Sequence, residues 1–219
     1  DLLSGKEMEK VVERNPVIEK KSVNNIMIAL YAFVVISFFI TIVDIIIRFP
    51  LQSEMIDYND IQAIVINVLA LLIQIFFFAY GFVNAIRGML SPKRMGAVIV
   101  AFFAATCITG TGNMVINSNV QIVLWWIVLI IPNIVGAVAT FAYFVSGKKS
   151  KIYSTMIYLV TIWGMFRIIY SNYNLIVHAN QYLSMNSTVR LVLEIAIHCL
   201  VIYQTYVLWI KRQNAIDIS

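Results

Sequence analysis

Charged side chains are scarce in this sequence. Asp, Glu, Lys and Arg make up 12% of its 219 residues, whereas hydrophobic residues make up 61%. A soluble domain carries about 25% charged residues, and a fold of this length has too little interior to bury such an apolar surplus. A soluble globular fold is therefore excluded, and we expect a lipid bilayer to solvate most of the chain.

Cysteine and histidine are also rare, with two of each in the whole chain. Both cysteines, Cys107 and Cys199, lie within apolar stretches, which is typical of packing residues and argues against a disulfide framework. A zinc site needs three or four ligands, and the spacing of His178, His198, Cys199 and Glu194 does not direct three of them to one point. The sequence therefore predicts no metal site.

Several motifs of membrane enzymes and channels are missing as well. The chain has no G-x-S-x-G elbow, no phosphate-binding glycine loop and no row of evenly spaced arginines such as a voltage sensor carries. We therefore expect no cofactor, and an enzyme is disfavoured. The net charge of +5 lies mostly in short segments between apolar runs, where membrane topology explains it, so we expect no nucleic-acid partner.

Long apolar runs, in contrast, are abundant. They lack the alternation of polar and apolar residues that marks transmembrane β-strands, and each is long enough for a helix that crosses a bilayer. The sequence thus predicts an all-α integral membrane protein with six transmembrane helices. The runs cover residues 24–48, 61–88, 95–115, 120–146, 152–177 and 189–210.

The segments between these runs alternate in charge, and cytoplasmic loops hold the excess of Lys and Arg. We therefore expect cytoplasmic N- and C-termini, three outward-facing hairpins and a location in the plasma membrane. The chain divides into a cytoplasmic segment with a short amphipathic helix (1–22), a transmembrane domain (23–212) and a cytoplasmic tail (213–219). The basic segments contain Lys20, Lys21, Lys93, Arg94, Lys148, Lys149, Lys151, Lys211 and Arg212.

Polar residues recur three or four positions apart on five of the six runs. Such side chains cost several kcal/mol in hydrocarbon unless they face protein or water, so we expect them to share a polar cavity that opens outward. Arg167 and Glu194 are its predicted central charge pair, and His198 lies one helical turn from Glu194. The other predicted substrate-binding residues are Asn67, Asn133 and Asn174.

The alternative is that the same polar residues have a purely structural role. Buried Arg–Glu pairs can fix helix register, and amide side chains between membrane helices contribute about 0.6 kcal/mol each. Asp44 and Arg48, four residues apart, are expected to form a structural ion pair of this kind.

Small residues form a ridge on the third run. Ala97, Ala101 and Ala105 recur every four residues, which allows another helix to approach closely. The expected neighbour is a helix of the same chain, and the alternative is a partner subunit or a second copy in a homo-oligomer.

Two functional hypotheses result. The leading one is a small-solute membrane transporter, or the membrane-embedded substrate-binding subunit of a transport complex. Arg167 and Glu194 would orient a charged or zwitterionic solute, and His198 would tune protonation. The alternative is a non-transporting membrane subunit for assembly, immunity or signalling, in which the polar residues only fix helix packing.

Overall fold

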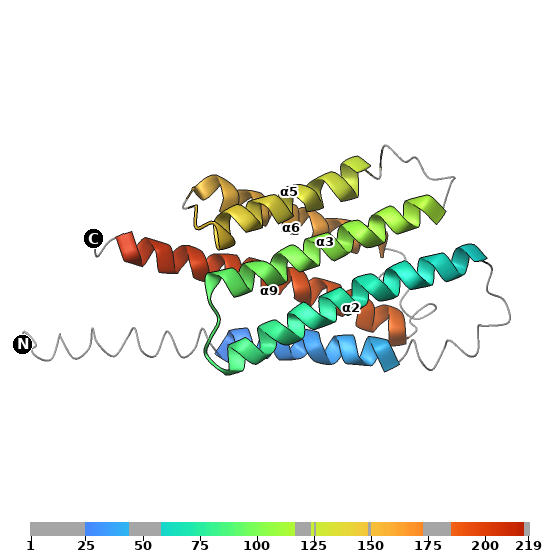
Figure 1. Cartoon of the computed structure of the whole chain (residues 1–219), viewed down its shortest axis with the longest axis horizontal. Helices are drawn as coiled ribbons and strands as arrows, with labels where there is room; N and C mark the ends of the chain where they lie inside the picture. Colours follow the sequence, from blue (N-terminus) through green and yellow to red (C-terminus); the bar gives the residue numbers. More distant parts are fainter. Residues whose placement is uncertain are drawn as a thin grey trace, which may run out of the picture.

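The computed structural model describes residues 25–43, 58–116, 124, 126–148, 150–172 and 185–216, and the elements within these ranges are helices (Figure 1). Six of them are long and apolar enough to cross a membrane. The prediction of a polytopic, helical integral membrane protein is therefore confirmed at this level. The side of the membrane that each end faces remains a prediction.

The helices follow one another with short connections at one end of the bundle. The fourth span is a single rod in which π-helical turns flank an α-helix. The bounds are Asn25–Val43 for the N-terminal helix, Tyr58–Ile86 for α2, Pro92–Ile116 for α3, Trp126–Ile130 for η2, Ile131–Thr140 for α5, Phe141–Val145 for η3, Lys151–Ser171 for α6 and Met185–Ile216 for α9.

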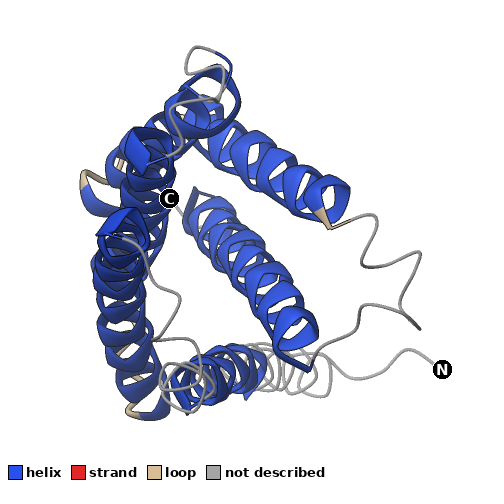
Figure 2. Ribbon diagram, turned by 90° about the vertical axis from the view of Figure 1, so that its right-hand side faces the viewer, coloured by secondary structure: helices blue, strands red, loops and turns tan. Residues whose placement is uncertain are grey.

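Helix α9 runs through the middle of the bundle (Figure 2). Helices that follow one another pack side by side: α2 on α3, α3 on α5, α5 on α6 and α6 on α9. Helix α9 also reaches α3, and it contacts the N-terminal helix through a hydrogen bond from Gln204 to Tyr31. The last span is thus surrounded by others, and half of its apolar stretch is buried.

The outer faces of the surrounding helices are apolar. Phe39, Phe76 and Leu159 are each more than 60% exposed in the isolated chain. Large apolar side chains occupy exposed positions on every span, which a soluble monomer rarely tolerates over such an area. A bilayer solvates such a surface, in agreement with the composition.

Glycines in the left-handed region end two of the spans. Gly88 follows α2 with φ +64°, and Gly147 follows η3 with φ +69°. After α2, the N–H of Met89 donates to the carbonyl of Asn84 (2.8 Å), which is the bond of a Schellman cap. Arg94 then donates through Nη1 to Oδ1 of Asn84 (2.8 Å) and so ties α3 to the end of α2.

A hydrogen bond beside a proline connects the fourth and fifth spans. Pro132 has no N–H to offer to the carbonyl of Val128, four residues earlier. The indole N–H of Trp163 on α6 donates to this carbonyl instead (2.8 Å). This bond holds η2 and α5 against α6, and a π-helical turn directly precedes the proline, as is common where a helix is interrupted.

Candidate functional site

Two oppositely charged residues of the described spans lie on the neighbouring helices α6 and α9. These helices run antiparallel and pack side by side (Figure 1). Arg167 on α6 and Glu194 on α9 are both half-buried and interact electrostatically across this interface. One helical turn further along, Gly164 of α6 faces His198 of α9. The predicted charge pair and its histidine therefore lie together.

The His198 ring is held on three sides. Its Nδ1 lies 2.7 Å from the backbone oxygen of Glu194, and because a carbonyl oxygen only accepts, Nδ1 carries a hydrogen in this bond. The ring of Phe102 on α3 meets the imidazole edge to face, at a centroid distance of 5.1 Å and an angle of 84°. Nε2 points toward Gly164, where an added Cβ would collide with it. The ring, 5% exposed, thus has one nitrogen committed and the other directed at α6.

The depth of this cluster follows from helix geometry. At 1.5 Å per residue, Glu194 lies about 5 Å and His198 about 10 Å from Leu191, where the apolar part of α9 begins. Arg167 lies about 6 Å from the end of α6 at Ser171. The hydrocarbon core of a bilayer is about 30 Å thick, so the cluster is close to one surface. This surface is opposite the basic turns.

Of the other three predicted substrate-binding residues, two lie elsewhere in the described part of the chain and one is not described. Asn174 lies outside the described residues. Asn67 lies on α2, which packs against α3. Asn133 donates through Nδ2 to the carbonyl of Leu129 in its own helix (2.6 Å). A short amide side chain reaches the carbonyl four residues back more easily than a neighbouring helix, and Thr140 does the same toward Gly136.

The remaining sequence predictions concern structural contacts. Asp44 and Arg48 lie outside the described residues. In the small-residue ridge, Ala101 and Ala105 are buried and Ala97 is half-buried by other helices of the same chain. This is the internal packing that the sequence favoured for the ridge.

A second polar contact, which the sequence analysis missed, joins three spans. Nε2 of Gln204 on α9 donates to the hydroxyl oxygen of Tyr31 on the N-terminal helix, and both residues are 0% exposed. The Tyr31 ring lies directly against Gly81 of α2. Oε1 of Gln204 has no hydrogen-bond partner among the described residues. A glutamine within an apolar run is costly in hydrocarbon, and this signal could have identified the contact.

The fold and the α6–α9 cluster define a polytopic helical membrane protein with ionisable side chains between two of its spans. Within the described ranges, no group of three His, Cys, Asp or Glu side chains could hold a metal ion. Comparison with protein-family models, curated proteins and solved structures gives no match for this chain.

Proposed function

We propose that the protein is a small-solute membrane transporter, or the membrane-embedded substrate-binding subunit of a transport complex. The observation that carries this proposal is the electrostatic interaction of Arg167 with Glu194 on the neighbouring helix, near one surface of the bundle and one turn from a buried histidine. A cation and an anion at this depth suit a charged or zwitterionic solute that enters from the nearer surface.

The charges of Arg167 and Glu194 are energetically costly at this interface. Removing a charged group from water costs several kcal/mol even after relaxation, and an apolar pair would pack α6 against α9 without this cost. A charge pair that also binds solute recovers part of the desolvation energy in the bound state. His198 places its Nε2 at the same interface between α6 and α9, and we propose that this imidazole tunes protonation.

A solute screen tests the proposal. Full-length protein in nanodiscs would be heated with a panel of amino acids and short mono- and dicarboxylates, and the unfolding temperature recorded. We expect at least one solute to stabilise the wild type, with the shift lost in Arg167→Gln and in Glu194→Gln. Arg87→Gln, which removes an exposed cation at the opposite end, is the matched control. Unchanged shifts in both variants would remove these residues from the site.

The tight packing of His198 favours the second hypothesis, in which the polar residues only fix helix contacts. The double exchange Arg167→Glu with Glu194→Arg separates the two. A structural pair works in either orientation, so the double exchange would restore both the stability and the function that each single substitution removes. A solute site depends on which helix carries which charge, so the exchange would restore stability alone.

A further inference from the structure

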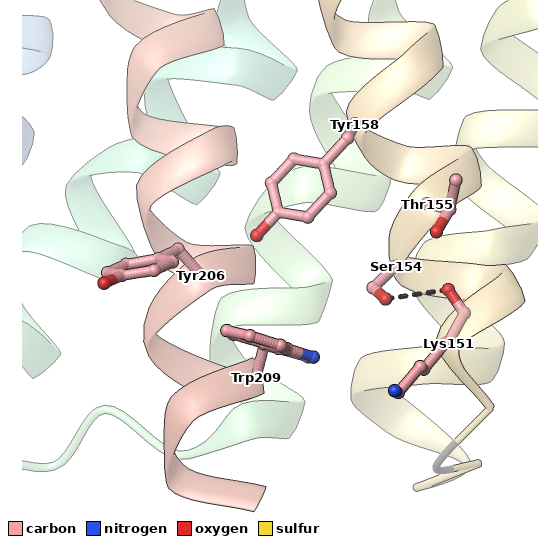
Figure 3. Close-up of a pocket in the computed structure, with 6 residues that line it drawn as sticks. All are labelled: Lys151, Ser154, Thr155, Tyr158, Tyr206 and Trp209. Carbon is pink, nitrogen blue, oxygen red and sulfur yellow. Dashed lines mark hydrogen bonds between the residues drawn. The ribbon is translucent and has the colours of Figure 1, made fainter. Parts of the chain in front are cut away.

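A cavity opens between α6 and α9 at the end of the bundle that bears the basic turns (Figure 3). Its volume of about 390 Å³ is within the range of about 300–1,000 Å³ that is common for small-molecule sites. The first two turns of α6 form one wall, and the last turns of the apolar part of α9 form the other. The lining residues are Lys151, Ser154, Thr155, Tyr158, Tyr206 and Trp209.

The charge of this cavity is positive. The ammonium group of Lys151 points into the space between the two helices (Figure 3). The sequence contains no Asp or Glu from 141 to 172 or from 198 to 216, whereas Lys148, Lys149, Lys211 and Arg212 lie in these same stretches. No acidic side chain on either wall compensates Lys151, so the cavity suits an anion.

Hydrogen-bond donors from both walls point into the same space. The indole N–H of Trp209 is directed toward α6, and the hydroxyl of Tyr158 is directed toward α9 (Figure 3). An ammonium group, an indole N–H and a phenol are donors that phosphate oxygens accept. The hydroxyl of Ser154 already donates to the carbonyl of Lys151 (2.9 Å), so the donors are those of Lys151, Tyr158 and Trp209.

The surroundings indicate where the anion comes from. Trp209 is the second-last residue of the apolar part of α9, which ends at Ile210, and Trp and Tyr favour the membrane–water interface. Toward the middle of the membrane, α6 continues with the exposed apolar side chains of Leu159 and Ile162. A phosphate group in the cavity would thus have an apolar surface beside it for acyl chains.

We propose that this cavity binds the phosphate of an acidic phospholipid of the leaflet at the basic end, with Lys151 as the cation and Trp209 and Tyr158 as donors. Basic pockets between transmembrane helices commonly bind anionic headgroups. The site lies eleven residues, about 16 Å along α9, from His198, so it is distinct from the proposed solute site and does not depend on it.

The test is a competition for bound lipid. Full-length protein in nanodiscs with equal amounts of phosphatidylglycerol and phosphatidylcholine would be released and analysed by native mass spectrometry. We expect about fivefold enrichment of phosphatidylglycerol on the wild type, the factor that one basic residue near an anionic surface supplies. Lys151→Gln would lose most of it, and Lys151→Arg would keep it. Both lipids carry a phosphate, so Trp209→Phe would lower the retention of both. Lys93→Gln, an equal charge loss in the other basic turn, would keep the enrichment too.

Three outcomes would overturn the proposal. One is equal retention of both lipids by the wild type. Another is an equal loss of enrichment in Lys93→Gln and Lys151→Gln, since this would indicate a diffuse surface charge. The third combines two results: inorganic phosphate stabilises the protein in lipid-free detergent in a way that depends on Lys151, and in nanodiscs it displaces bound phosphatidylglycerol. This would assign the cavity to a free anion.

Discussion

The contact between Gly164 and His198 leads to a quantitative prediction. An alanine Cβ at position 164 would collide with Nε2 of His198 and lie 3.0 Å from its Cδ2. The ring cannot swing away cheaply, because its Nδ1 donates to the Glu194 carbonyl and the Phe102 ring packs against it in a T-shaped arrangement. Overpacking of this kind costs about 1–3 kcal/mol.

The replacement of Gly164 by alanine also makes a favourable contribution to stability. Alanine stabilises a helix interior by about 1 kcal/mol relative to glycine, so Gly164→Ala should lower the free energy of unfolding by about 1 kcal/mol net. In a His198→Ala background the collision is absent, and only the gain in helix stability from alanine remains. There, the same replacement should be neutral or stabilise by up to about 1 kcal/mol.

The double-mutant cycle of these two positions therefore has an expected coupling of about 2 kcal/mol, within the usual range for residues in contact. The assay is reversible unfolding in mixed micelles with increasing denaturing detergent, followed by circular dichroism for the four proteins of the cycle. An effect of Gly164→Ala that is the same with and without His198 would refute the packing of α6 on α9 described above.

Two further predictions concern other contacts. Tyr31→Phe removes the hydrogen-bond partner of the buried Gln204 amide, so the free energy of unfolding in the same assay should fall by about 1–3 kcal/mol. The double variant Tyr31→Phe with Gln204→Met should be close to wild type. Equal losses of stability in both variants would contradict the contact. Gly88→Ala places a Cβ in open space but at φ +64°, so backbone strain alone should lower the free energy of unfolding by about 1–2 kcal/mol. An unchanged unfolding midpoint would show that the turn does not require a left-handed residue.

The spans were predictable because membrane insertion depends on local composition. Any stretch of about 20 apolar residues satisfies its own backbone hydrogen bonds as a helix, whatever its neighbours are. The third run contains the less apolar stretch Gly110 to Asn113, yet α3 remains helical to Ile116. The cap at Gly88 was not predicted: the run 61–88 included this glycine in the helix, whereas it ends the helix with a positive φ.

The candidate site was predictable only in part. Helical periodicity puts Gly164 and Arg167 on one face of α6, and Glu194 and His198 on one face of α9. Which helix each face meets is not encoded locally, because five other spans compete for the same contact. The same limit explains Asn133, whose amide bonds within its own helix.

The geometry of the seam between α6 and α9 bears on why the charges are present. The Gly164–His198 contact is already specific to one register, since a glycine and a bulky ring must coincide. The same interface continues two turns away, where Tyr158 of α6 and Tyr206 of α9 line opposite walls of the cavity. A charge pair whose only role was register would therefore duplicate contacts that need no desolvation. On this ground we keep the proposal that Arg167 and Glu194 bind a solute that enters from the nearer surface, and the exchange of their charges is the experiment that separates the two roles.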